Sequence, residues 1–424
     1  MDTLTCSSPI DASSTDHDRM TRAKRRRIAG LASITVTFLA TSSAPTPLYT
    51  TYQSQWGFSD QMVTMVFGVY ALALLVTLLS AGRLSDHLGR RRVILVGIVV
   101  QILAVATYVD AHSVTTLLVA RVIQGVATGV TLGAVGAAML DIDARSGAVA
   151  NSTAPGVGTA SGAVISSFTV QWLPAPTRLI YLIFVGILVT QLLWVTRLPE
   201  TSPRHRGAWG SMIPQLTIPL QTRRPLLSAA PVLFAVWALA GFFGSLGPSL
   251  IAQLVHSQSV VAGGAGLGVL AGVAAVTTYV LRQWPATRVM VTGTLALSAG
   301  VAVVILGVAT SSWVVFFAGT TISGVGFGAG FQGGMRLVAP LAHPDQRAGV
   351  LAVLYMISYL AMGVPAVLAG TAVVHGVGLA HTSYFYLAGV IVLSVVAFVK
   401  LVTMTKLPST PVRSIQQSRE ANTR

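Results

Sequence analysis

The polar stretch GRLSDHLGRRRV, residues 82–93, separates two long apolar runs and is the most informative segment of the chain. The apolar runs lie near 61–81 and 93–109. Each is close to the roughly 20 residues that a helix needs to cross a bilayer. The short connection between them carries three consecutive arginines at its end. It therefore predicts two membrane helices joined by a tight basic loop on one face of the membrane.

The same alternation continues along all 424 residues, of which 53% are hydrophobic and only 9% charged, with a mean hydropathy of +0.73. This is more apolar surface than a soluble core of that size could bury, which excludes a water-soluble enzyme. The first run is too long for a signal peptide and favours a retained helix. Ten further apolar runs bring the total to twelve; they lie near 28–50, 114–140, 146–170, 179–196, 226–252, 259–281, 289–309, 312–335, 347–373 and 378–402.

The cations lie almost entirely on one side of these twelve spans. If the N-terminus is cytoplasmic, all of the 27 Lys and Arg residues except Arg121 and Arg178 fall in cytoplasmic segments. Cytoplasmic loops are enriched in Lys and Arg, so we expect both termini in the cytoplasm. The basic run at 19–27 is interpreted as a topology signal next to anionic lipid rather than as a nucleic-acid-binding arm.

The spans divide into two sets of six around a stretch that is rich in arginine and proline. The start of the fifth span, RSGA at 145–148, resembles the start of the eleventh, RAGV at 347–350. Such repeats place a substrate site near the membrane midplane, between the halves. The expected organisation is a cytoplasmic tail (1–27), a six-helix bundle (28–196), a cytoplasmic central loop (197–225), a second six-helix bundle (226–402) and a cytoplasmic tail (403–424).

The 82–93 stretch closely resembles the signature loop of the major facilitator superfamily. The resemblance implies an all-α membrane protein with twelve transmembrane helices in two six-helix bundles. It also implies that Asp86 meets the start of the eleventh helix, near residue 347, where a helix N-terminus favours an anion, and so latches the cytoplasmic side shut in the outward-facing state. The second half has Arg282 at the acidic position, so we expect one latch. The matching residues are Gly82, Asp86, Gly89, Arg90 and Arg91.

The fourth span contains RVIQGVATG, residues 121–129, which is similar to a second motif of the family that is found in proton-linked exporters. A charge at membrane depth is costly, so Arg121 is expected to point inward. Gln124 and Thr128 follow on the same helical face. Glycines recur every fourth residue from 125 to 133 and predict close helix packing. A Gly-Pro-rich stretch at 154–162 does not reproduce the order of the exporters' third motif.

Carboxylates and histidines occur only in tails, loops and span edges. An intramembrane enzyme or metal centre would need them to converge at depth, so no catalytic residue, metal or cofactor is expected. No phosphate-binding GxxxxGK[ST] motif is present, which excludes ATP-driven transport by this chain alone. Cys6, the only cysteine, has no second thiol to form a disulfide with.

By family geometry, the first, fourth, seventh and tenth spans line the cavity. Aromatic side chains, a few neutral polar groups and one cation suit neutral, weakly acidic or amphipathic organic molecules. The candidate substrate or coupling residues are Arg121, Gln124, Thr128, Trp237, Phe327, Gln332 and Tyr359. Other residues expected to line the cavity are Ser33, Thr37, Thr41, Phe234, Phe242, Phe243, Thr321, Phe331, Tyr355 and Met362.

The sequence thus predicts a monomeric secondary transporter in a bacterial-type plasma membrane, which exports a small organic compound by alternating access with protons as the candidate coupling ion. An importer of a nutrient or metabolite is the alternative, followed by a non-transporting sensor. No nucleic-acid partner is expected. Arg121 has two candidate roles. It binds an anionic group of the substrate, which we favour, or it tunes a proton site at Asp60 or Asp110.

Overall fold

The computed structural model describes residues 10–202, 218–255, 260–343 and 346–406. Cys6 and most of the predicted central loop lie outside these ranges. Within them every regular element is a helix. Twelve helices cross the bundle: α1 (Ile10–Ser43), α3 (Asp60–Ala81), α5 (Arg90–Val109), α6 (Val114–Ile142), α7 (Ala144–Trp172), α8 (Leu179–Val195), α9 (Leu220–Ser245), α11 (Val260–Val280), α12 (Ala286–Ala309), α13 (Trp313–Val338), α14 (Arg347–Ala372) and α15 (Leu379–Lys406).

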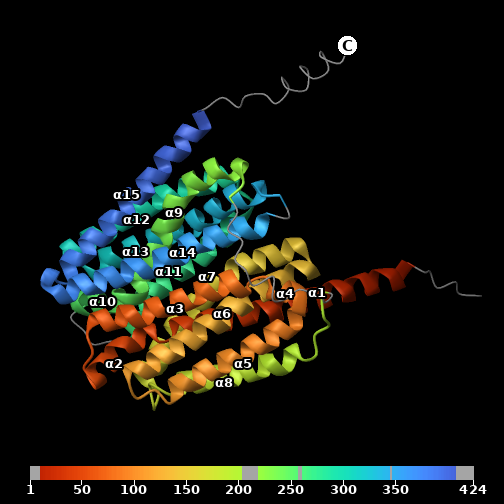
Figure 1. Ribbon diagram of the computed structural model, residues 1–424, viewed down its shortest axis with the longest axis horizontal. Coiled ribbons are helices and arrows are strands. Elements are labelled where there is room, and N and C mark those ends of the chain that lie inside the picture. Colours follow the sequence, from red (N-terminus) through yellow and green to blue (C-terminus); the bar gives the residue numbers. More distant parts are fainter. Residues whose placement is uncertain (1–9, 203–217, 256–259, 344–345, 407–424) are drawn as a thin grey trace, which may run out of the picture.

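Short elements connect these helices at both ends of the bundle. Helix α4 (Leu84–Leu88) forms the signature loop, and α2 (Tyr49–Trp56) and α10 (Gly247–Val255) follow α1 and α9. The remaining short turns are η1 (Thr46–Leu48), η3 (Leu281–Gln283), η4 (Ala339–Leu341) and η5 (Val373–Val377). We call the end that carries α4 the basic end and the end that carries α2 and α10 the far end; they lie at opposite sides of Figure 1.

Ten of the described helices are long and apolar enough to span a membrane by themselves. The other two that cross the bundle are α8, with 17 apolar residues, and α7, with 29 residues rich in Gly, Ser and Thr. Helix α7 tolerates this composition because it packs between α1 and α11. Small residues at such interfaces let helices approach closely.

Two boundaries differ from the sequence-based prediction. Helix α1 begins at Ile10, well before the apolar run at 28; the Arg and Lys residues at 19–27 are good helix formers and favour its extension through that segment. The predicted single run at 226–252 is divided into α9 and α10, which Leu246 separates.

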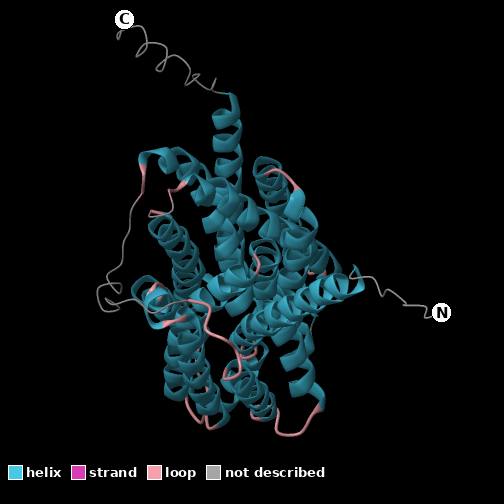
Figure 2. Cartoon of the chain, turned by 90° about the vertical axis from the view of Figure 1, so that its right-hand side faces the viewer, coloured by secondary structure: helices cyan, strands magenta, loops and turns pink. Residues whose placement is uncertain are grey.

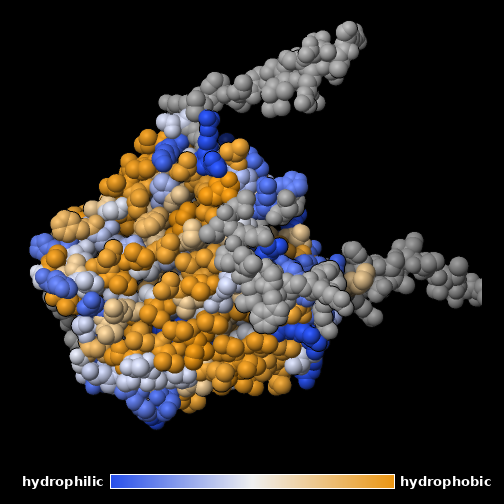
Figure 3. Space-filling model, in the orientation of Figure 1, coloured by the Kyte–Doolittle hydropathy of each residue, from blue (hydrophilic) through white to orange (hydrophobic). Residues whose placement is uncertain are grey.

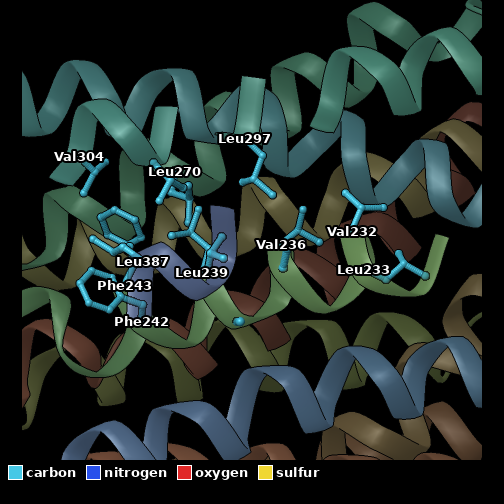
Figure 4. Packing of buried hydrophobic residues seen from close by; sticks show 14 of the residues in the cluster. Val232, Leu233, Val236, Leu239, Phe242, Phe243, Leu270, Leu297, Val304 and Leu387 are labelled. Atoms are coloured by element: carbon cyan, nitrogen blue, oxygen red, sulfur yellow. The ribbon is translucent and has the colours of Figure 1, made fainter. Parts of the chain in front are cut away.

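The twelve helices form two halves, shown in red to yellow-green and in green to blue in Figure 1; Figure 2 shows that the long helices run roughly alongside one another. Each half has its own buried hydrophobic core. In the second half, Phe242 and Phe243 of α9 belong to one buried cluster with Leu270 of α11 and Leu297 of α12 (Figure 4). Outside, hydrophobic residues cover the flanks of the helices, and hydrophilic residues gather mostly near the two ends (Figure 3).

The halves meet along two seams, α3 against α14 and α7 against α11. In the first seam, Gln61 Nε2 donates to Thr371 Oγ1 at 3.4 Å near the far end. In the second, α11 presents glycines to α7; a Cβ built at Gly268 would lie only 2.8 Å from the Val164 side chain. The turn η1 also packs on both α7 and α11. The two halves are therefore in close contact at the far end.

Candidate functional site

Arg121 is completely buried in the first half, two turns into α6. Its Nη1 donates to the Ser42 carbonyl oxygen at 2.8 Å and to Gln124 Oε1 at 2.9 Å. Its Nη2 donates to the Tyr49 hydroxyl at 2.5 Å. Ser42 belongs to the last turn of α1, where carbonyl groups lack helical partners and carry partial negative charge. Arg121 therefore holds the end of α1 through neutral acceptors.

Three tyrosine rings surround the guanidinium group. The Arg121 Cζ lies 5.3 Å from the ring centroid of Tyr70, 5.8 Å from that of Tyr49 and 5.9 Å from that of Tyr108. The Tyr108 hydroxyl donates to Gln124 Oε1 at 3.2 Å. Aromatic faces attract a cation electrostatically. We call Arg121, Gln124 and these three tyrosines the tyrosine cage.

The two acids that could carry a proton, Asp60 and Asp110, interact with residues other than Arg121. Asp60 Oδ1 accepts from Gln53 Nε2 at 2.9 Å. The Asp110 carboxylate pairs with His112 at 3.1 Å, and its side chain is 85% exposed. A direct ion pair of Arg121 with a carboxylate does not occur among the described residues.

A second cluster lies between the halves, where α3, α9, α13 and α14 meet. The Trp237 ring lies 5.2 Å from Tyr359, 5.5 Å from Phe331 and 6.0 Å from Phe327, centroid to centroid. The Trp237 Nε1 has no hydrogen-bond partner. We call these four residues the central aromatic cluster. Three of them, Trp237, Phe327 and Tyr359, were candidate site residues, and the fold brings them together.

Tyr70 of α3 connects the tyrosine cage to the central aromatic cluster. Its ring faces Arg121, and it also packs with Tyr359 and Met362 of α14 in a buried cluster that Trp237 touches. Sequence reasoning missed Tyr49, Tyr70 and Tyr108. A tyrosine among apolar residues is an ordinary core residue by its sequence, and only the tertiary structure brings these three around one cation.

Other predicted cavity residues lie elsewhere. Gln332 donates through Nε2 to the Thr278 carbonyl at 3.0 Å, on the α11 side of α13. Thr128, in contrast, lies beside the tyrosine cage: it is buried and donates to the carbonyl of Gln124 one turn earlier, at 2.8 Å. Phe242 and Phe243 belong to the core of the second half, and Thr321 is exposed. A membrane helix is apolar on most faces, so its sequence does not reveal which face points to the centre.

The polar stripe of α1 was also expected to face the cavity, but it points into the first half. Gln191 Nε2 of α8 donates to Thr37 Oγ1 at 2.9 Å and to Ser33 Oγ at 3.2 Å. Gln101 Nε2 of α5 donates to Thr41 Oγ1 at 2.6 Å. The two glutamine amides find their acceptors here, because buried polar groups need hydrogen-bond partners.

The signature loop is held by contacts within its own half. Arg90 pairs with Asp86, donates to Ser85 Oγ at 2.7 Å and lies 3.5 Å from Asp141. The expected contact between Asp86 and α14 stays a prediction for a conformation in which the basic end is closed. Sequence reasoning did not identify Asp141.

The turn into α5 depends on Gly89 and on an acid from a distant segment. Gly89 has φ +94°, a conformation that glycine adopts without strain. The backbone N–H of Arg91 donates to Glu200 Oε1 at 3.2 Å, and the Arg91 guanidinium donates to the Thr196 carbonyl. The segment after α8 is thereby attached to the signature loop. Gly82 has ordinary helical dihedral angles and ends α3.

The glycines of α6 make the close approach to α3 that their spacing predicts. A Cβ at Gly125 would lie 2.8 Å from the Tyr70 carbonyl oxygen, and one at Gly129 would lie 2.8 Å from that of Leu74. Gly133 is looser, with its nearest neighbour, the Gly82 oxygen, at 3.5 Å. The tight contact places Tyr70 beside Arg121.

Twelve helices in two halves, with an aromatic cluster between them and a buried cation beside it, define a polytopic membrane transporter. The sequence pattern of the Major Facilitator Superfamily matches residues 31–296, more than half of the chain. The chain belongs to the Major Facilitator Superfamily and is a transporter of small molecules rather than an enzyme. This confirms the predicted family and fold class.

Curated relatives match the chain over short stretches. Multidrug resistance protein D of Escherichia coli (strain K12) is 44% identical over 68 residues, which are 16% of this chain and 17% of that protein. Multidrug resistance protein MdtL of Klebsiella pneumoniae (strain 342) is 36% identical over 73 residues, 17% of this chain and 19% of that protein. The chain thus spans less than a fifth of the length of the curated relatives that it matches.

Solved structures match nearly the whole chain at low identity. The nucleoside transporter NupG superposes with a TM-score of 0.69 at 12% identity, covering 89% of this chain and 99% of that one. The human organic anion transporter MFSD10 superposes with a TM-score of 0.65 at 19% identity, covering 88% and 99%. At these identities the likeness establishes the fold alone.

Proposed function

We propose that this chain exports small organic compounds with an aromatic or other apolar body by alternating access. The observation that carries the proposal is the central aromatic cluster, which α9, α13 and α14 of the second half present at the seam with α3 of the first half. Aromatic side chains at the interface between the halves can bind an apolar molecule by burying its surface and by stacking on its rings. The partial similarity to multidrug resistance proteins favours export over import.

The proposed orientation places both termini and the basic end in the cytoplasm of a bacterial-type plasma membrane, because cations gather there. The far end is then the outer face. The close contact between the halves at this end is typical of an inward-facing or occluded state. The latch between Asp86 and α14 is proposed to form when the halves rock to the outward-facing state. We propose that the chain does this as a monomer.

Coupling to protons is a further part of the proposal. Arginine does not deprotonate in proteins, so Arg121 itself cannot carry the proton. The proton would be carried by the substrate or by an acid at a span edge, Asp60 or Asp110. The test is to add substrate to proteoliposomes that contain a pH-sensitive dye. If proton movement persists in both Asp60→Asn and Asp110→Asn, the substrate carries the proton. If proton movement is lost in one of these variants, the replaced acid carries it.

The transport proposal is tested by the accumulation of a panel of aromatic acids, neutral aromatics and aromatic cations in cells with and without the protein. Export lowers the accumulation of at least one class. Trp237→Ala should reduce this effect several-fold by removing the central ring. Trp313→Ala is the matched control, because Trp313 is 54% exposed at the start of α13.

Each alternative has its own outcome in this experiment. A rise in accumulation on expression would identify an importer. Unchanged accumulation of every compound, with normal protein abundance, would favour a non-transporting sensor. An equal loss of export activity in Trp237→Ala and Trp313→Ala would contradict a role of the central aromatic cluster in substrate binding.

A further inference from the structure

The buried charge of Arg121 is only partly compensated. Its three hydrogen-bond acceptors are a carbonyl, an amide oxygen and a hydroxyl, all neutral. The end of α1 supplies the equivalent of about half a negative charge at Ser42. A buried cation is normally paired with a carboxylate, because desolvation of an unpaired charge is costly. The tyrosine cage therefore keeps a net positive charge.

Three polar atoms of the cage have no hydrogen-bond partner: the Tyr70 hydroxyl, which can donate or accept, and two groups that can only donate. Arg121 Nε and Gln124 Nε2 are buried without a hydrogen-bond partner. The orientation of the Gln124 amide follows from its contacts, since Arg121 and Tyr108 both donate to its Oε1. Its NH₂ group is thus the free one. A buried donor without an acceptor is unfavourable, because it loses its hydrogen bonds to water and gains none in the protein.

The other buried glutamines of the first half show the opposite pattern. Gln101 and Gln191, the other two buried glutamines of the first half, each use their NH₂ group and leave an oxygen acceptor without a partner. A neutral molecule rich in acceptors could fill the cage's hydrogen bonds, but it would not compensate the charge. An anion does both.

Tyr70 lies between the cage and the central aromatic cluster. Its ring centroid lies 5.3 Å from the Arg121 Cζ, and it belongs to the same buried cluster as Tyr359. If this ring turns aside, a molecule with its apolar body against Trp237 can bring a charged end to Arg121. The planar guanidinium group suits a carboxylate, whose two oxygens accept parallel hydrogen bonds.

We propose that the tyrosine cage binds the anionic group of the substrate, and that the preferred substrates are organic carboxylates with an aromatic or aliphatic body. This inference rests on the proposed transport function and specifies its substrate class. Tyr70 acts as the side chain that admits the charged group, Arg121 and Gln124 donate to it, and the central aromatic cluster contacts the body.

The test compares two probes that share a body and differ in charge. The purified full chain in nanodiscs of zwitterionic lipid is titrated with 4-phenylbutyrate and with the uncharged 4-phenylbutyramide. Hydrogen bonds to charged groups are stronger than those between neutral groups, so the acid should bind at least about tenfold more tightly. Thiocyanate, an anion without this body, should compete with the acid and not with the amide.

Variants distinguish binding of the acid at the tyrosine cage from a general effect of positive charge on the protein. Arg121→Gln should abolish the preference for the acid. Arg121→Lys should keep part of this preference, because lysine retains the positive charge but lacks the planar pair of guanidinium donors. Arg282→Gln is the control: Arg282 lies in η3 over the Tyr279 ring, away from the cage, and its loss should leave the preference unchanged. If Arg121→Gln does not fold, Gln124→Met should reduce the preference several-fold.

Equal affinity for the two probes in the wild-type chain, or no binding of either phenylbutyrate or thiocyanate, would overturn the anion site and leave Arg121 as a residue that holds the end of α1. Flux measured with the same chain in proteoliposomes distinguishes this result from failure of the proposed function. Acid-selective binding without flux contradicts transport and keeps the site. Flux of 4-phenylbutyrate that Arg121→Gln leaves intact contradicts the site and keeps transport.

Discussion

Replacing Gly129 with alanine is expected to destabilise the first half by separating α3 from α6. The new Cβ would lie 2.8 Å from the Leu74 carbonyl oxygen, 2.9 Å from the Thr77 Cβ and 3.1 Å from the Leu78 nitrogen. Ordinary contact begins at 3.4 Å, so the closest approach is short by roughly 0.6 Å. Two of these three atoms belong to the backbone of α3, which cannot yield by rotating a side chain.

The magnitude follows from two opposing terms. Overpacking of this kind costs about 1–3 kcal/mol. The better helix propensity of alanine returns up to about 1 kcal/mol. With the full gain subtracted, the net loss is up to about 2 kcal/mol, which should lower the melting temperature in detergent by up to roughly 8 °C if the first half melts as one unit. Because Tyr70 lies on α3, the ligand affinity of the tyrosine cage should fall as well.

Gly133→Ala is the matched control on the same helix. Its Cβ would meet only the Gly82 carbonyl oxygen at 3.5 Å, an ordinary contact, so it gains helix propensity without overpacking. Thermal unfolding followed by intrinsic fluorescence compares both variants with the wild type. The reasoning is refuted if Gly129→Ala melts at or above the wild-type temperature, or if Gly133→Ala is the less stable of the two.

Three further outcomes are expected. Reporter fusions after Arg224 and after Arg424 should both report the cytoplasm, and a periplasmic signal from either would reverse the proposed orientation. Asp86→Asn should slow turnover at normal membrane abundance, and wild-type flux at matched expression would remove the latch. The Asp143 carboxylate caps α7 by accepting the backbone N–H of Ser146 at 2.7 Å, which lowers its pKa below the ordinary 3.8. The stabilisation is present above that ordinary pKa and is lost as the pH falls through the lowered value in the folded protein. Asp143→Asn, which still caps the helix, should flatten this acid-side loss of melting temperature; an unchanged acid profile would contradict the assignment.

The sequence by itself determined the elements of this transporter. Long apolar runs must become helices in a bilayer, because each backbone polar group needs a partner there. The positions of the twelve crossing helices, the signature loop at 82–93 and the inward-facing Arg121 could all be predicted in this way. The glycine spacing from 125 to 133 also predicted a close contact, although not that α3 would be the partner.

Only the tertiary structure decided how each helix is rotated. In a membrane the outer surface is as apolar as the core, so apolar periodicity does not show which face of a helix points inward. Ser33, Thr37 and Thr41 therefore looked like cavity residues, but they pair with glutamines inside the first half. Tyr49, Tyr70 and Tyr108 come from three separate segments, and their common partner Arg121 exists as a site only because helix packing brings them together.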